Sequence, residues 1–422
     1  MSKDNSRFAP NQEETDSKTV LEEIMREGAR KLLAIAMETE VDDFIEKMSP
    51  KLDNNGHRLA VRNGYHSERT IMTGIGPINI KQPRVDDRKL QKLYPDIKFQ
   101  SDILPRYLRR VASIDNLIPV LYLKGVSTQD FPDALAAILG DSAKNLSANT
   151  IVRLKQAWIK EYNDWSKRDL SDKKYVYIWA DGVYFNVRLD DAKSCILMIM
   201  AADDKGKKEL LAVSDGYRES KLSWATMLQD LKRRGLDMCP SLAIADGGLG
   251  FWAALREIYP DTIEQRCWVH KTANILDKMP KSIQSKAKKM IHDMYLADSK
   301  KAALSEYDFF IKTFEDKYPS AANCLKKDYD QLFSFYDFPA VHWQHIRTTN
   351  PIESTFATVR LRTKRTKGCG SRDATLTMVF QLAREAEKRW RKLRGFRLLP
   401  YVLEGEKFVD GIPENETLKK VA

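Results

Sequence analysis

Two short apolar runs that each end in an Asp-Gly pair constrain the fold of this chain more than any other feature. Tyr-Val-Tyr-Ile-Trp-Ala at 175–180 leads into Asp181, and Ser-Leu-Ala-Ile-Ala at 241–245 leads into Asp246. Such runs of aromatic, β-branched and small apolar residues predict buried β-strands. Functional groups gather at strand ends in α/β sheets, because the strands are rigid and the loops that follow are open. We therefore expect two carboxylates side by side at the end of a sheet.

The residues around these runs predict an α/β layer fold. Adjoining strands followed by alternating helix and strand are typical of a sheet covered by helices. Strand patterns recur at 184–189, 195–201, 209–213 and 262–267, and helical patterns at 222–234 and 249–258. From 270 to 336 the pattern is helical and Lys-rich, which predicts a helical block inserted before the α/β domain resumes. Helices are expected again from Asn350, with a long basic one at 373–393.

The first part of the chain predicts one helix and a small hairpin. Apolar residues at helical spacing over 18–48 indicate one long amphipathic helix or two shorter ones. Residues 70–72 and 78–80 flank a Gly-rich turn, as in a hairpin.

Three further helical patterns, at 114–123, 129–139 and 147–165, predict a tri-helical arrangement of the helix-turn-helix type. In such folds the start of the last helix meets base edges. Asn149, Arg153 and Gln156 would share one face there and are our candidates for DNA contact. Short helices joined by Gly turns also occur in domains without a DNA-binding role, so plain packing of these helices is the alternative.

Positive charge is concentrated towards the C-terminal end. The chain has a formal net charge of +11, and residues 343–400 contain fourteen Lys or Arg against four acids. A charge run is usually a solvated helix face, but this density favours contact with the phosphates of a polyanion. The side chains expected to hold a nucleic-acid backbone are Arg360, Arg362, Lys364, Arg365 and Lys367.

Asp181 and Asp246 are candidates for a divalent-metal site. Burying ionised carboxylates costs roughly several kcal/mol unless a cation or hydrogen bonds compensate, and Mg²⁺ prefers carboxylate and phosphate oxygens. Glu353 is the candidate third acid, in a helix that Asn350 would cap and Pro351 would begin. Taken singly, an Asp-Gly pair is more often a turn and such a Glu an ordinary capping residue. Competing acids near other strand ends are Asp190, Asp203, Asp204 and Asp215.

Six short motifs follow one another between about residues 62 and 394. They are Arg-Asn-Gly-Tyr at 62–65, Leu-Lys-Gly-Val-Ser-Thr at 123–128, Asp-Gly-Val-Tyr at 181–184, Ala-Asp-Gly at 245–247, Arg-Cys-Trp-Val-His at 266–270 and Thr-Thr-Asn-Pro-Ile-Glu-Ser at 348–354. Each motif alone is weak, but their order and spacing are specific. In these motifs the chain resembles the Mutator-type transposases of bacterial insertion sequences.

The resemblance implies a DDE transposase with an α/β ribonuclease H-like catalytic domain, an all-helical insertion and a mainly helical N-terminal DNA-binding region. Asp181, Asp246 and Glu353 match the family's catalytic, metal-binding triad, which implies Mg²⁺ or Mn²⁺, expected as two ions. In the implied reaction water attacks a phosphodiester at the end of the element, and the freed 3′-hydroxyl then attacks another phosphodiester. The implied partners are terminal inverted repeats and target DNA, and the handling of two DNA ends implies a homo-oligomer on DNA.

Cys267 and His270 form a C-x-x-H motif after an expected strand and resemble the family's C/D-x-x-H signature. We expect His270 near the active site, contacting phosphate or orienting a ligand, with Cys267 packed beside it and Asn350 as further support. A buried structural histidine is the alternative. A zinc site would need two more ligands, which only the remote His342 and His345 could supply.

The five cysteines are scattered and odd in number, which fits reduced thiols better than a disulfide framework. No apolar stretch approaches the roughly 18 residues of a membrane span, and the polar first residues lack a signal-peptide segment. We therefore expect a cytoplasmic protein without a membrane partner.

These patterns divide the chain into consecutive regions. They are an N-terminal helical segment (1–50), a hairpin-containing region (51–110), a helix-turn-helix type domain (111–168), the first part of the ribonuclease H-like core (172–275), the helical insertion (276–342), the last core helices with the basic segment (343–400) and a tail (401–422). Besides a transposase, two functions stay open. One is a catalytically silent DNA-binding regulator derived from a transposase, against which the intact acid triad argues. The other is a nuclease or recombinase that hydrolyses DNA without strand transfer.

Overall fold

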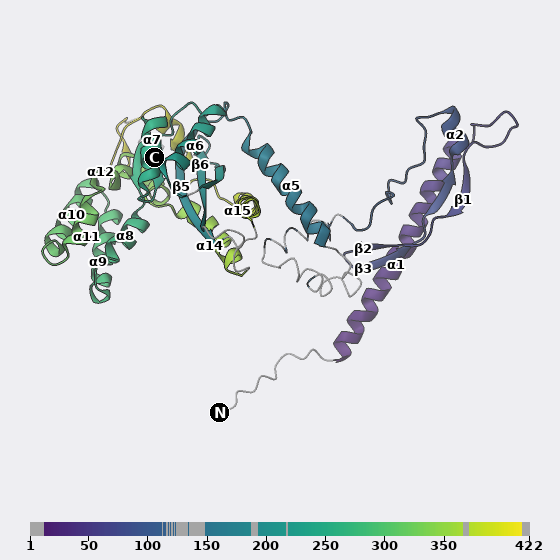
Figure 1. Ribbon diagram of the computed structural model, residues 1–422, viewed down its shortest axis with the longest axis horizontal. Coiled ribbons are helices and arrows are strands. Elements are labelled where there is room, and N and C mark those ends of the chain that lie inside the picture. The colour runs from purple at the N-terminus through teal and green to yellow at the C-terminus, as the bar shows by residue number, and fades with distance from the viewer. Residues whose placement is uncertain are drawn as a thin grey trace. The chain divides into compact units, whose positions relative to one another are not determined.

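The chain forms two compact units, Met1–Leu154 and Lys155–Ala422 (Figure 1). The computed structural model describes residues 12–111, 148–186, 193–216, 218–365 and 371–415, with single positions between 113 and 134. The helices expected at 114–123 and 129–139 lie largely outside the described residues. The third expected helix is α5 (Ala148–Ser166), which crosses the boundary between the units.

The N-terminal unit combines one long helix with two small antiparallel sheets. Its elements are α1 (Gln12–Met48), β1 (Val61–Tyr65), β2 (Arg69–Thr73), β3 (Gly76–Ile80), β4 (Pro83–Asp86) and α2 (Arg88–Leu93). Strand β2 pairs with β3, and β1 pairs with β4. The predicted hairpin is therefore confirmed, and the residues of the predicted N-terminal helix form one helix rather than two.

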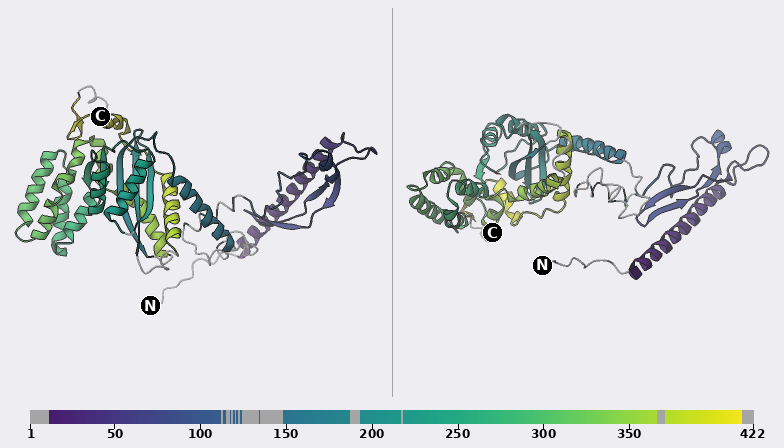
Figure 2. Two further views of the ribbon diagram at one scale, coloured as in Figure 1. Left: turned by 45° about the horizontal axis from the view of Figure 1, so that its top comes forward. Right: turned by 60° about the horizontal axis from the view of Figure 1, so that its bottom comes forward.

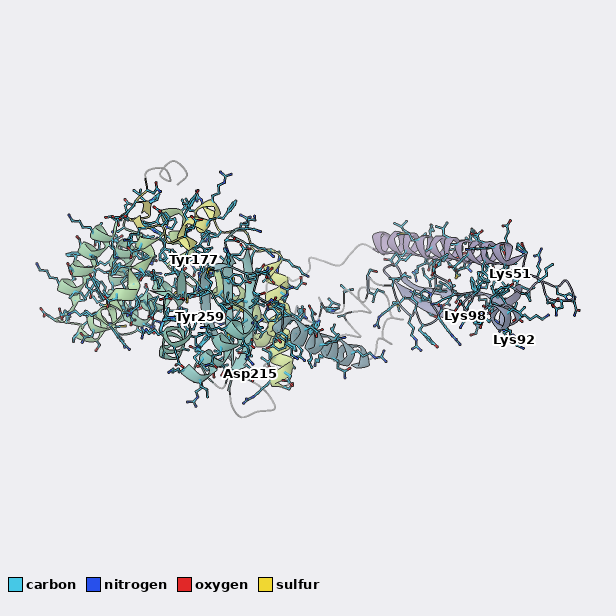
Figure 3. All side chains as sticks on the ribbon, turned by 90° about the horizontal axis from the view of Figure 1, so that it is seen from above. Lys51, Lys92, Lys98, Tyr177, Asp215 and Tyr259 are labelled. Atoms are coloured by element: carbon cyan, nitrogen blue, oxygen red, sulfur yellow. The ribbon has the colours of Figure 1, made fainter. Side chains whose placement is uncertain are left out.

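Buried apolar side chains hold α1 against the hairpin. Met37 of α1 is buried together with Ile71 and Ile78 of the hairpin. A polar contact also links α1 to the segment after α2: the carboxylate of Glu40 accepts a hydrogen bond from the N–H of Asp102 at 2.7 Å. Lysines lie on this unit as well, among them the labelled residues of Figure 3: Lys51, Lys92 and Lys98.

A five-stranded mixed sheet is the centre of the C-terminal unit. Its strands are β5 (Tyr175–Asn186), β6 (Lys193–Asp203), β7 (Lys208–Gly216), β8 (Leu242–Ala245) and β9 (Ile263–Arg266). The order across the sheet is β7-β6-β5-β8-β9. Strands β5, β6 and β7 pair antiparallel, whereas β8 and β9 run parallel to β5. The expected mixed α/β layer fold is confirmed in this unit.

Helices cover both faces of this sheet (Figure 2). Helices α6 (Lys221–Arg233) and α7 (Leu249–Ile258) share a buried apolar cluster with Ile178 and Ala180 of β5. Tyr177 and Trp179 alternate with these residues and therefore face the opposite side. There the ring of Tyr177 lies against Phe338, and α14 (Asn350–Arg365) contacts β5 while α15 (Arg372–Glu387) contacts β7. Asp181 continues the alternation of Tyr177 and Trp179 and faces the α14 side.

Strand β5 is longer than the sequence predicts. Separate strands are expected at 175–180 and 184–189, but β5 runs from Tyr175 to Asn186 without a break. Its parallel pairing with β8 stops at Ala180 opposite Ala245, while its antiparallel pairing with β6 continues to Asn186. The long β6 partner keeps this end extended. Asp181 therefore lies where the parallel part of the sheet ends, and not at the end of its own strand.

The predicted helical block is confirmed over the described residues. It contains α8 (Trp268–Leu276), α9 (Lys281–Leu296), α10 (Lys300–Phe314), α11 (Pro319–Lys326) and α12 (Tyr329–Leu332), followed by η2 (Ser334–Asp337), η3 (Ala340–His342) and α13 (Trp343–Ile346). Figure 2 shows α8 to α11 as a group beside the sheet.

The last described segments are short. The helix predicted at 373–393 is shorter than expected, since α15 ends at Glu387 and the N–H groups of Arg389 and Trp390 bond the carbonyls of Ala386 and Glu387 in a turn. The elements that follow are η4 (Phe396–Leu398), α16 (Leu399–Leu403), β10 (Phe408–Val409) and β11 (Ile412–Pro413). Among the described helices, none is both long and apolar enough to span a bilayer.

Candidate active site

Asp181 is a buried carboxylate in the middle of the sheet. Only 6% of the residue is exposed, and its Oδ1 accepts a hydrogen bond from the N–H of Gly182 at 2.8 Å. Burial, together with the charges of Asp246 and Glu353, raises the pKa of Asp181 to about 7, against the opposing charge of His270. The charges of Asp246 and Glu353 therefore both reach Asp181 in the site.

Asp246 directly follows the neighbouring strand β8, at the same level across the sheet as Asp181. Ala180 pairs with Ala245, so the two aspartates that follow them emerge side by side from parallel strands. The Oδ1 of Asp246 accepts from the N–H of Gly248 at 2.8 Å, and its carbonyl accepts from Nε1 of Trp252 at 2.9 Å. Both contacts fix the Asp246 loop at the start of α7.

Glu353 reaches the site from the first turn of α14. The helix begins at Asn350, and the carbonyl of Thr349 accepts from the N–H groups of Ile352 and Glu353. Thr349, rather than the predicted Asn350, therefore directly precedes the helix in the capping position, and its hydroxyl donates to Oε1 of Glu353 at 2.7 Å. Asn350 is exposed as the first residue of the helix.

Cys267 and His270 lie directly behind Glu353. Nδ1 of His270 is 3.7 Å from Oε1 of Glu353, and ligand atoms of Cys267, His270 and Glu353 all lie within 4.8 Å of one another. A hydrogen bond with the Cys267 side chain, together with the charges of Asp181 and Glu353, raises the pKa of His270 to about 9, although burial opposes the shift. The imidazole of His270 therefore lies beside the acids, and its raised pKa favours the charged form there.

The second histidine pair proposed for zinc is engaged elsewhere. Nδ1 of His342 bonds the hydroxyl of Tyr177 and its Nε2 bonds the carbonyl of Gly395. Nε2 of His345 accepts from the N–H of Arg394 at 3.4 Å. Neither histidine belongs to the group formed by Cys267 and His270. A four-ligand zinc site of this composition is not formed.

The donor set of the three acids suits a hard divalent cation. Within the described ranges, no Lys or Arg forms a salt bridge with Asp181, Asp246 or Glu353; the one charged partner shown is His270. Several carboxylates gathered around a buried one repel each other unless a cation or protons intervene. Oxygen donors of this kind are those that Mg²⁺ prefers.

A buried ion cluster lies next to Asp246. Oδ2 of Asp328 accepts from Nε of Arg266 at 3.1 Å and from Nζ of Lys271 at 2.7 Å. These residues and Gly247 line a cavity of about 740 Å³. The cluster joins β9 and α8 to the N-terminal end of α12 and so fixes part of the helical block beside the acids.

The competing acids have other surroundings. The Oδ1 of Asp203 accepts from the N–H groups of Lys205 and Lys207, so this residue forms the turn between β6 and β7. Asp215 lies 3.9 Å from a guanidinium nitrogen of Arg372. Asp204 belongs to the same turn as Asp203, and Asp190 lies outside the described residues.

The predicted DNA-contacting residues are only partly described. Arg153 and Gln156 are exposed on α5, and Asn149 is near its start. Arg360 is exposed on α14, whose last turns also contain Arg362, Lys364 and Arg365. Lys367 falls outside the described part of the chain.

One acid near the site was missed from the sequence. The carboxylate of Glu219 lies against Gly182, next to Asp181. Burial raises the pKa of Glu219, as does the charge of Asp246, and His270 lowers it. In the sequence, Glu219 directly precedes Ser220 and has the pattern of an ordinary helix start. The glycines near Asp181 and Asp246 are the only sequence signal that another side chain packs close to these two acids.

Comparison with known proteins decides the family. The model of the family described as "Transposase, Mutator family" matches residues 2–393. The chain belongs to the Mutator family of transposases. Among its relatives, the transposase for insertion sequence element IST2 of Acidithiobacillus ferrooxidans is 49% identical, over 68% of this chain and 97% of the relative. The transposase for insertion sequence element IS6120 of Mycolicibacterium smegmatis is also 49% identical, over 71% of this chain and 92% of the relative.

A more distant transposase matches a larger share of the chain. The transposase for insertion sequence element ISRM5 of Rhizobium meliloti is 24% identical, over 87% of this chain and 88% of the relative. The family resemblance found in the short motifs is thus confirmed. Mutator transposases, as transposases, bind and cut DNA and transfer its strands, and they generally require divalent metal ions.

Proposed function

We propose that this Mutator-family chain is a DDE transposase of an insertion sequence, with Asp181, Asp246 and Glu353 as its catalytic triad. The observation that carries the proposal is the approach of two acids to the buried Asp181: Asp246, which follows the adjacent parallel strand, and Glu353, from a helix on the same side of the sheet. They would hold Mg²⁺ or Mn²⁺, expected as two ions. The mixed sheet with helices on both faces supports a ribonuclease H-like core.

The bound metal would activate the attacking oxygen and offset the charge that develops on the phosphate. The chain itself positions the acids. Gly248 fixes Asp246, and Thr349 fixes Glu353 through its hydroxyl. His270, whose pKa is raised by the hydrogen bond with Cys267, places positive charge beside Glu353. In this position it can contact a DNA phosphate or hold the Glu353 carboxylate.

The proposed DNA substrate is the terminal inverted repeats together with target DNA. The basic side chains of α14 would hold the backbone, since this helix starts at the site and carries the charged run from Arg360 onwards. Base contacts are proposed for the start of α5, at Asn149, Arg153 and Gln156. The joining of two DNA ends makes a homo-oligomer on DNA the expected working form.

The test compares full-length wild type with Asp246→Asn and Glu353→Gln on a DNA fragment that carries one element end. We expect both variants to bind DNA with wild-type affinity and to lose Mg²⁺-dependent strand cleavage. Asp204→Asn is the matched control, since Asp204 belongs to a turn away from the site, and it should cleave normally. Undiminished cleavage by Asp246→Asn would overturn the triad.

The same assay addresses the alternatives. The comparisons name relatives that are transposases and give no support to a silent regulator, which would show no cleavage even as wild type. A labelled 3′-end separates strand transfer from hydrolysis, because transfer moves the label into a longer product. We expect the label in joined DNA.

A further inference from the structure

Glu219 occupies a loop position between β7 and α6 that brings its side chain to the metal-site end of the sheet. It directly precedes Ser220, whose Oγ caps α6 by accepting from the N–H of Ser223. The helix cap is therefore provided by Ser220, and the Glu219 carboxylate is not needed for it. Within the described part of the chain, no salt bridge or side-chain hydrogen bond is formed by that carboxylate.

Glycines at three positions make room for this side chain and its backbone. A Cβ on Gly182 would lie 2.6 Å from Oε1 of Glu219, and one on Gly250 would lie 2.7 Å from the backbone N of Lys221. Real Cβ atoms essentially never come so close to other atoms. The Glu219 side chain can take this position beside Asp181 only because Gly182, which follows Asp181, lacks a side chain.

The third glycine, Gly248, shows how near Glu219 comes to Asp246. The position of a Cβ on Gly248 is 3.2 Å from Oδ1 of Asp246 and 3.2 Å from Oε2 of Glu219. The two carboxylate oxygens are therefore separated by no more than twice that distance. At such a separation, two half-buried carboxylates repel each other unless a cation lies nearby.

We propose that Glu219 is a fourth carboxylate of the catalytic metal site, facing the metal beside Asp246. This inference rests on the proposed function, because it needs a metal held by Asp246. Glu219 approaches from the side of α6, whereas Glu353 approaches from α14 on the other face of the sheet. Asp246 is thus flanked by acids from both faces, which gives the site four carboxylates instead of three.

The test measures Mn²⁺ binding to the full-length protein without DNA, from the loss of the free Mn²⁺ signal in electron paramagnetic resonance. Loss of the carboxylate in Glu219→Gln should weaken Mn²⁺ binding about tenfold or more, as expected when a ligand or its close partner is removed. Glu257→Gln is the matched control, since Glu257 is exposed on α7 and pairs with Lys221 at 2.8 Å; it should bind Mn²⁺ as wild type does.

Thermal unfolding separates a metal-facing role from a structural one. In EDTA, Glu219→Gln removes a like charge beside Asp246 and should melt at or above the wild-type temperature. In Mn²⁺ it should gain less stabilisation than wild type, because ligands that bind the folded state raise its stability. Lower stability in EDTA together with unchanged Mn²⁺ binding would mean that Glu219 only supports the loop, and would overturn the proposal.

Cleavage assays keep this proposal distinct from the proposed function. If Asp246→Asn loses cleavage and Mn²⁺ binding while Glu219→Gln keeps both at wild-type metal concentrations, the triad stands and Glu219 has no part in it. If Asp246→Asn keeps both, the triad itself is wrong, and the Glu219 proposal is overturned with it. The expected result is that Glu219→Gln needs about tenfold or more Mn²⁺ for half-maximal cleavage and binds DNA normally in EDTA.

Discussion

The hydroxyl of Tyr177 lies 2.8 Å from Nδ1 of His342, in the interior between β5 and the segment that leads to α14. Nε2 of His342 donates to the carbonyl of Gly395 at 2.9 Å, so Nδ1 is the acceptor of the tyrosine hydroxyl. His342 is fully buried. Burial lowers the pKa of His342 to about 4, against the opposing effect of the Gly395 carbonyl.

This buried histidine predicts a loss of stability in mild acid. Its folded pKa lies below the ordinary value of 6.5, so its contribution is complete above pH 6.5 and is lost as the pH falls towards 4. We expect the free energy of unfolding to fall by about 1 kcal/mol between pH 7.5 and 5.5 on its account. Urea titrations of wild type and His342→Gln measure the difference, since the variant should lack this part of the slope. The exposed His57→Gln should keep it, and an equal slope in all three proteins would refute the assignment.

The ion cluster around Asp328 predicts a large stability effect. Asp328→Asn would leave Lys271 and Arg266 without their shared carboxylate, and these two residues are 1% and 5% exposed. Removing one partner of a buried pair costs about 3 to 5 kcal/mol. Denaturant unfolding should show this loss. The control is Asp330→Asn, at an exposed position two residues further along the chain, which should change the free energy of unfolding by less than about 0.5 kcal/mol. A similarly small loss for Asp328→Asn would contradict the prediction and would mean that water replaces the carboxylate of Asp328 as the partner of Lys271 and Arg266.

Thr349 is predicted to position Glu353. Thr349 is fully buried; its hydroxyl donates to Oε1 of Glu353 at 2.7 Å, and its N–H donates to Sγ of Cys267 at 3.3 Å. Thr349→Val keeps the volume but removes the hydroxyl, so we expect strand cleavage to slow by about 10- to 100-fold with unchanged DNA affinity. Thr349→Ser should restore most of the rate. Thr313→Val is the control, because its hydroxyl bonds only the carbonyl of Phe309 within α10; equal rates for Thr349→Val and wild type would remove Thr349 from the site.

The basic end of α14 is predicted to contact DNA phosphates. Replacing Arg360, Arg362 and Lys364 by glutamine should weaken binding to all DNA sequences equally. Each lost contact should also reduce the slope of log binding constant against log salt by about one unit. Filter-binding titrations at several salt concentrations measure this slope. The triple change of Lys301, Lys312 and Lys317 in the helical block removes the same charge elsewhere, and a matching change of slope in both proteins would argue against a specific role for α14.

Local patterns were sufficient to predict most of the elements that hold the site. The apolar runs before Asp181 and Asp246 predicted adjacent strands, and the motif around Glu353 predicted the start of a helix. What the sequence did not reveal depends on partners that are distant in the chain. The continuation of β5 past Asp181 follows from its pairing with β6, and the capping role of Thr349 follows from where α14 begins.

Glu219 is the clearest case of this limit of local patterns. Its neighbours Arg218 and Ser220 give it the appearance of a solvated residue before a helix. Its approach to Asp246 results from the packing of the Glu219 loop on the glycines at 182, 248 and 250. A glycine's missing side chain shows that something must lie close, but it does not show which residue lies there.

All five strands of the central sheet are complete by Arg266, whereas α14 begins only at Asn350, after the helical block. A ribosome that stalls or stops within the block would therefore release a product with both strand-borne aspartates but without Glu353. On the proposed assignment such a fragment cannot break a chromosome. On that assignment, DNA cleavage requires synthesis to pass the helical block and reach α14, because the last acid of the triad lies beyond the whole sheet and the block.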